Sequence, residues 1–446
     1  MSIPPAERPG RVAYVNARLL DPATGLDAPG ALLTEGPAIA DYGPRLFALG
    51  VPEGAEIVDC AGACLAPGLV DIRVQLREPG EEHKETIATG SLAAAAGGVT
   101  AMVCLPNTDP VIDDVAGVEF IARRAREVKL VKIYCHAAVT QRLEGEQLAE
   151  IGLLKEAGAL AFTDGLQAVA NPLVMRRALA YARTVDALII QHPEEPVLAA
   201  GGVMNEGLVA TRLGLAGIPK AAEIIMIERD LRLVELTHGR YHASHVSTAE
   251  GVDAIRKAKT RGLRASCDTA PPYFTLEESA VGDYRTFAKL SPPLRAAADR
   301  AAIIEGLADG TIDAIASDHA PHDQDSKRLP FAQAADGIIG LETLLPLALA
   351  LVHDGQVGLL TALAALTFRP ADLLGLQAGR LARGAPADLV LFDPDRSWTI
   401  EESAFRSKSK NSPFAGREVR GKVLRTIVDG RPVFAAERPM LAAAAK

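Results

Sequence analysis

The chain lacks most features of secreted and membrane proteins. It carries only five cysteines, and no second Cys or His pair accompanies Cys60 and Cys64 at the spacing of a zinc ribbon. We interpret all five as buried thiols in a reducing compartment. No basic head followed by an apolar core opens the sequence, which argues against a secretory signal. Apolar runs are broken by Gly, Pro or charge before they reach membrane-spanning length, so we expect a soluble, cytoplasmic protein.

The charge balance also excludes a class of partner. The formal net charge is -9, and no run of like charges is long enough to form an interaction tail. An acidic chain of this kind argues against a nucleic-acid surface. The 446 residues are 48% hydrophobic, which is ample for a large buried core. We therefore predict a large globular protein that binds neither nucleic acid nor membranes.

The order of the apolar segments predicts an α/β fold. Near the N-terminus, segments such as "RVAYVNARLLDP" read as short strands, whereas from Gly68 onward strand-like pieces alternate with amphipathic helices. About eight such strands in roughly 300 residues match a (β/α)₈ TIM barrel. No Gly-rich dinucleotide fingerprint follows the first strand, which weakens the Rossmann alternative. The tail returns to alternating strands, so we predict a small β-sandwich lobe built from both chain ends. The predicted segments are 1–66 and 373–446 for the lobe and 67–372 for the barrel.

Polar side chains able to bind metal follow four of the strand-like runs. They are Asp164 in "AFTDG", His192 in "IIQHPEE", His245 in "HASHVST" and Asp318 in "IASDHAPH". One histidine after a strand is usually structural, but four such residues in a chain with nine histidines are harder to dismiss. Because strand ends meet at one face of a barrel, these residues predict a carboxylate-and-imidazole zinc site.

Several motifs occur in an order that resembles one known family. They are "PGLVDIRVQLREPG", "VCLPNTDPVID", "HPEEPVLAAGGVMNEG", "ASHVST", "SPPLR", "SDHAPH" and "GIIGLETLLPL". Together they cover nearly the whole chain and resemble the dihydroorotases of the amidohydrolase superfamily, in the bacterial type that uses an Asp as bridging ligand. The resemblance implies reversible interconversion of dihydroorotate and N-carbamoyl-L-aspartate in pyrimidine biosynthesis, through a metal-bound hydroxide. It also implies at least a homodimer.

The resemblance assigns roles to individual residues. It implies that Asp164 is the bridging ligand, that His192 and His245 are ligands of the second metal position, and that Asp318 is a metal ligand or general acid/base. The residues expected to bind the substrate are Arg77 and Asn107, which would hold its carboxylate, His322, and Ser291, which stands where the family has Asn.

The first strand motif departs from the family at two positions. Arg73 and Gln75 stand where these enzymes usually carry two His ligands. A guanidinium has no lone pair to give, and an amide oxygen is a poor zinc donor, so a second metal is not expected. One zinc at Asp164, His192 and His245 would keep an open position for water. Arg73 would then supply the positive charge of the missing metal ion by pairing with Asp164 or Asp318.

Three hypotheses remain open from the sequence. The first is an active hydrolase of cyclic amides, a dihydroorotase with one zinc. The second is a non-catalytic dihydroorotase-like partner of aspartate transcarbamoylase. The third is another cyclic amidohydrolase, of the hydantoinase or allantoinase type. Retention of the remaining ligand and substrate residues favours activity, because unpaired polar groups are costly to bury. The expected ligand is a small anionic cyclic amide.

Overall fold

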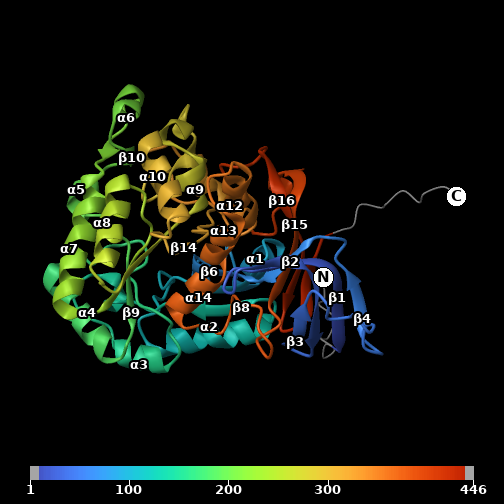
Figure 1. Cartoon of the computed structure of the whole chain (residues 1–446). Helices are drawn as coiled ribbons and strands as arrows, with labels where there is room; N and C mark the ends of the chain where they lie inside the picture. Colours follow the sequence, from blue (N-terminus) through green and yellow to red (C-terminus); the bar gives the residue numbers. More distant parts are fainter. Residues whose placement is uncertain (1–9, 437–446) are drawn as a thin grey trace.

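The computed structural model describes residues 10–436 and consists of a barrel with a β lobe beside it (Figure 1). The predicted fold class, a (β/α)₈ barrel with a lobe built from both chain ends, is confirmed. The predicted boundaries at residues 66 and 373 stay predictions, and positions 1–9 and 437–446 of the predicted lobe lie outside the described residues. Within the described part, no helix combines the length and apolar character needed to cross a bilayer.

The lobe strands from both chain ends join one continuous eight-stranded sheet. Its order is β17-β16-β15-β5-β1-β2-β3, and β4 pairs with β1. The contact between the two chain ends is the antiparallel pairing of β5 with β15. The strand bounds are β1 (Arg11–Asp21), β2 (Leu26–Glu35), β3 (Ala38–Gly43), β4 (Glu56–Asp59), β5 (Cys64–Pro67), β15 (Leu389–Thr399), β16 (Glu418–Val428) and β17 (Arg431–Ala435).

The barrel wall is built from parallel strands that read as short apolar runs. Such runs are typical of strands buried on both faces. Two sheets, β6-β7-β8 and β14-β13-β12-β9, are joined by bridges from Ala137 to Phe162, from Phe162 to Ile189, and from Val74 to His319. These bridges close the ring. The strand bounds are β6 (Leu69–Val74), β7 (Val99–Cys104), β8 (Lys132–Cys135), β9 (Leu188–Gln191), β12 (Arg240–Ala243), β13 (Ala265–Thr269) and β14 (Ala314–Ile315), with a separate small pair β10 (Met204–Asn205) and β11 (Gly217–Ile218).

Helices surround the barrel, and several start at side-chain caps. Asp114 accepts a hydrogen bond from the amide of Gly117 to begin α2, and Thr248 accepts one from Gly251 to begin α8. The α-helix bounds are α1 (Ile87–Ala96), α2 (Val115–Val128), α3 (Ile151–Glu156), α4 (Pro172–Thr184), α5 (Pro196–Ala199), α6 (Leu208–Leu213), α7 (Ala221–Thr237), α8 (Ala249–Thr260), α9 (Pro271–Thr275), α10 (Ala297–Ala308), α11 (Gln324–Arg328), α12 (Leu344–His353), α13 (Leu359–Leu366) and α14 (Phe368–Leu374).

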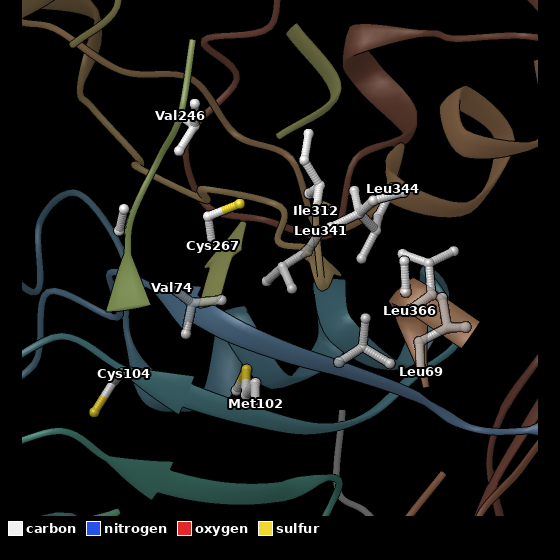
Figure 2. Packing of buried hydrophobic residues seen from close by; sticks show 14 of the residues in the cluster. Leu69, Val74, Met102, Cys104, Val246, Cys267, Ile312, Leu341, Leu344 and Leu366 are labelled. Carbon is white, nitrogen blue, oxygen red and sulfur yellow. The ribbon is translucent and has the colours of Figure 1, made fainter. Parts of the chain in front are cut away.

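The largest hydrophobic cluster lies between the barrel strands and the surrounding helices. Figure 2 shows side chains of this cluster from several barrel strands and helices, including Leu69, Met102 and Leu366. The cysteines of the chain are free and buried, as predicted for thiols. The same cluster continues into the lobe through side chains such as Phe392 on β15. The lobe therefore shares a core with the barrel, and Leu69 at the start of β6 belongs to it.

We predict that Phe392→Ala will lower the stability of the whole chain. Phe392 is fully buried in the shared cluster, and truncating a buried phenylalanine costs about 3–5 kcal/mol through lost burial and the cavity left behind. The matched control is Leu49→Ala, because the Leu49 side chain is fully exposed. Thermal and urea denaturation should show a marked loss for Phe392→Ala alone. Equal midpoints for the two variants would contradict the shared core.

Candidate active site

The candidate site residues lie at the carboxyl ends of the barrel strands. Arg73 is near the end of β6, His192 directly follows β9, His245 comes two residues after β12, and Asp318 follows β14. Each is buried. Because parallel strands place these ends at one face, side chains far apart in sequence converge there. Positive φ angles at Arg77 (59°) and Asp318 (49°) mark strained backbone at the same end.

A chain of ion pairs occupies the centre of this face. Arg73 Nε donates to Asp318 Oδ1 at 3.1 Å. The same carboxylate oxygen lies 3.1 Å from His245 Nε2, and His245 Nδ1 lies 2.9 Å from Asp268 Oδ1. All four side chains are buried. Of the two partners predicted for Arg73, the structure therefore shows Asp318 and not Asp164.

The buried charges stabilise one another. Burial alone would lower the pKa of His245, but the carboxylates of Asp268 and Asp318 outweigh burial and raise it to about 9. Burial alone would raise the pKa of Asp318, but His245 and Arg73 hold it below its usual value. Asp318 is therefore a carboxylate at neutral pH, which suits a group that accepts a proton.

The other two predicted ligands have partners of their own. Asp164 Oδ1 accepts hydrogen bonds from the amides of Val139 and Thr140, both at 2.9 Å, and Oδ2 accepts one from the Thr140 hydroxyl. His192 Nε2 lies 3.0 Å from Ser291 Oγ. Burial, together with the charge of Arg73, lowers the pKa of His192 to about 3, so its imidazole is neutral.

This arrangement does not fit the zinc site that the resemblance implies. Across residues 10–436, no group of three or more His, Cys, Asp or Glu side chains is placed to hold an ion. His245 lies between two carboxylates, whereas a metal ligand must direct a ring nitrogen at the ion. The metal-ligand roles of Asp164, His192, His245 and Asp318 stay predictions.

The predicted substrate residues lie in two groups. Arg77 donates from Nε to the carbonyl of Pro321 at 3.2 Å, and its Nη2 lies 3.2 Å from His322 Nε2. Asn107 Nδ2 donates to Gln75 Oε1 at 3.1 Å. The side chains of Arg77 and His322 are almost fully buried, so both are held in place before any ligand arrives.

The contacts of His322 leave one ring nitrogen free. Its Nε2 lies 2.7 Å from the carbonyl oxygen of Asp336, which can only accept, so the proton is assigned to Nε2 and the 3.2 Å contact with Arg77 Nη2 is not a hydrogen bond. Nδ1 is then an acceptor, and it has no hydrogen-bond partner in the described part of the chain. Burial, with the positive charge of Arg77, lowers the pKa of His322 to about 3. A neutral acceptor beside a fixed cation suits a ligand that has both an N–H group and a negative charge.

Sequence reasoning missed Asp268, which is the last member of the central series of ion pairs. Asp268 lies within β13 in the stretch "LRASCDTAP", and Ser244 Oγ also donates to it at 3.0 Å. An Asp inside an otherwise strand-like apolar run was the available signal. Burial would raise its pKa, but His245 and His242 lower the pKa well below the usual value.

Two family models match the chain. The model described as "Dihydro-orotase-like" matches residues 62–251, and the model described as "Amidohydrolase family" matches residues 222–434. Among curated proteins, a dihydroorotase of Wolbachia sp. subsp. Brugia malayi is 50% identical over 430 residues, which cover 96% of this chain and 97% of that protein. A dihydroorotase of Pelobacter propionicus is 50% identical over 94% of this chain and 98% of its own length.

Solved structures support the same fold. L-hydantoinase (dihydropyrimidinase) from Arthrobacter aurescens superimposes with a TM-score of 0.85 at 25% identity, covering 96% of each chain. A dihydropyrimidinase from Brevibacillus agri gives a TM-score of 0.82 at 23% identity, over 95% of each chain. These likenesses extend over both the barrel and the lobe.

We predict that His322→Gln will reduce the loss of folding stability that occurs as the pH falls below about 6.5. The unfolded imidazole titrates near 6.5 and the folded one near 3, so the unfolded chain binds the extra proton as pH falls below about 6.5. Stability is therefore lost between about pH 6.5 and 3, and glutamine cannot take up that proton. Denaturation midpoints at pH 5 and 7.5 should differ less for His322→Gln than for the wild type. An unchanged difference would contradict the buried, neutral His322.

Proposed function

Because this chain belongs to the dihydroorotase family of the amidohydrolase superfamily, we propose that it is a dihydroorotase, a hydrolase that interconverts dihydroorotate and N-carbamoyl-L-aspartate. The observation that carries the proposal is the match to proteins of that name, at about 50% identity along nearly their whole length. The geometry supports it, because a buried cation at Arg77 and an ionised Asp318 belong to the same barrel face. The substrate is a small anionic cyclic amide, made in pyrimidine biosynthesis.

Arg77 is proposed to hold the substrate carboxylate. A guanidinium can grip a carboxylate with two parallel hydrogen bonds, which fixes both position and orientation. Arg77 is itself held by Glu81 through Nη1, at 2.9 Å, and by the Pro321 carbonyl. Asn107 offers amide groups at the same mouth, and the free Nδ1 of His322 is proposed to accept from a ring N–H. The hydroxyl of Ser291 is proposed as a further substrate contact.

Asp318 is proposed to move the proton. Its described contacts with Arg73 and His245 all engage Oδ1, so Oδ2 is the oxygen available to a water molecule. The carboxylate would accept a proton as the water oxygen bonds to the ring carbonyl carbon. It would then return that proton to the nitrogen as the carbon–nitrogen bond breaks. The reverse sequence closes the ring.

Dihydroorotases of this superfamily depend on a metal ion, which supplies a nucleophilic hydroxide. The one-zinc centre expected at Asp164, His192 and His245 would require these side chains to exchange their present partners. The proposed roles in substrate binding and proton transfer therefore involve only side chains of the protein.

A second candidate function is favoured by the Arg73–Asp318 ion pair. A base that is already paired with a buried cation is a weaker proton acceptor. On that ground the chain would be a non-catalytic partner of aspartate transcarbamoylase. Dihydroorotase activity of the purified chain separates the two candidates. Hydantoin serves as a comparison substrate that tests for a hydantoinase.

We predict that the purified chain interconverts N-carbamoyl-L-aspartate and dihydroorotate. Asp318→Asn should lower the rate at least about 100-fold, because the amide cannot accept the proton. Asp283→Asn is the matched control, since Asp283 is exposed. No turnover by the wild type, with aspartate transcarbamoylase activity that depends on this chain, would favour the second candidate. Faster turnover of hydantoin would favour the third hypothesis.

A separate prediction concerns binding of the substrate carboxylate. Arg77→Lys should raise KM for N-carbamoyl-L-aspartate about tenfold or more, because an ammonium group cannot form the forked pair of hydrogen bonds. The exposed Arg142, changed to Lys, serves as the control. Steady-state kinetics of both variants make the comparison. An unchanged KM in Arg77→Lys would rule out Arg77 as the carboxylate anchor.

A further inference from the structure

By the sequence resemblance, Arg73 stands at a position where the family usually has a metal-binding imidazole. Its side chain is 1% exposed, and Nε is bound to Asp318. Asp318 is the same residue that the resemblance makes a metal ligand. A permanently charged guanidinium therefore supplies, from within the chain, positive charge next to the Asp318 carboxylate, in addition to that of His245.

The other two guanidinium nitrogen atoms of Arg73 have no hydrogen-bond partner in the described part of the chain. Nη1 and Nη2 are both buried and form no hydrogen bond within residues 10–436. Leaving charged donors unpaired in a protein interior is costly, so an oxygen atom from outside the chain is needed to satisfy them. The Nε contact with Asp318 shows that the guanidinium lies beside the proposed proton acceptor.

The second replaced position is also closed to a metal. Gln75 Oε1, the one atom of that side chain able to act as a ligand, accepts the hydrogen bond from Asn107. Gln75 thus connects the end of the first barrel strand to Asn107, whose side-chain amide is proposed to bind the substrate. Arg73 and Gln75 each have a hydrogen-bond partner within the chain, Asp318 and Asn107 respectively.

We infer that Arg73 takes the place and the charge of a metal ion, and that its two free nitrogen atoms bind an oxygen of the anionic cyclic ligand without any metal. The identity of the ligand rests on the proposed function, whereas independence from metal does not. Arg73 is then a ligand-binding residue next to Asp318, and Arg77 holds the other end of the ligand.

The metal arm of the test compares zinc content in three proteins. After expression with added zinc and exhaustive dialysis, the wild type and Gln75→His should hold little zinc. The double variant Arg73→His, Gln75→His should gain about one ion per chain, because it regains two imidazoles and loses the guanidinium. Gln75→His is the matched control, since it adds an imidazole while the guanidinium stays. A wild type that holds about one zinc per chain, lost in His245→Ala, would overturn the inference.

The ligand arm uses equilibrium dialysis with labelled N-carbamoyl-L-aspartate in the presence of EDTA. The label follows both the open and the cyclic form, so turnover does not disturb the measurement. The wild type should retain ligand in EDTA, and Arg73→Met should bind at least about tenfold more weakly, as expected for loss of charge-assisted hydrogen bonds. Arg73→Lys should fall between them, because it keeps the charge and loses the fork.

Two results would contradict the ligand arm. One is loss of binding by the wild type in EDTA. The other is wild-type affinity in a folded Arg73→Met protein, which would mean that only water meets the free nitrogen atoms. If Arg73→Met does not fold, the wild-type measurement in EDTA and the zinc contents still show whether the ligand binds without a metal ion. Ligand binding without metal and without turnover would reject the proposed activity alone, whereas zinc-dependent turnover would reject the inference alone.

Discussion

The buried ion pair between Arg73 and Asp318 is the constraint on which the rest of the site depends. The two residues are 245 positions apart, and their contact joins the first and last strands of the barrel. Removing one partner of a buried pair typically costs about 3–5 kcal/mol, because the other charge is left unpaired. His245 and Asp268 extend the pair into a chain of alternating charge. The charges at the centre of the barrel thereby balance one another through side chains alone.

The fold explains how that balance is reached. Short parallel strands, buried on both faces, direct their carboxyl ends to one side of the barrel, and the bridge between Val74 and His319 holds β6 beside the β14 end. The lobe shares a hydrophobic cluster with the barrel through β15, and Leu69 at the start of β6 packs in the same cluster. The polar side chains then meet in fixed positions, with Arg77 and His322 held at the mouth. This is the arrangement expected of a site prepared for an anionic ligand.

Much of this could be predicted from the sequence, and the reason is periodicity. Alternation of apolar strands and amphipathic helices predicts the barrel, and strand ends predict that Asp164, His192, His245 and Asp318 lie at one barrel face, although their common role as metal ligands stays a prediction. What could not be predicted depends on side-chain direction. Asp164 turns to the amides of Val139 and Thr140, and Asp268 completes the chain from within β13. Hydrogen bonding also joins the lobe strands in one sheet, which short strands from two chain ends do not reveal by pattern.

The guanidinium of Arg73, rather than a metal ion, is inferred to balance the carboxylates at the barrel centre. The most direct measurement is a crystal structure of the chain grown with excess zinc, with diffraction data collected at the zinc absorption edge. Clear density for the contact between Arg73 and Asp318, and no anomalous peak beside His245, is the expected result. An anomalous peak bound by His192 and His245, with Arg73 displaced from Asp318, would contradict it.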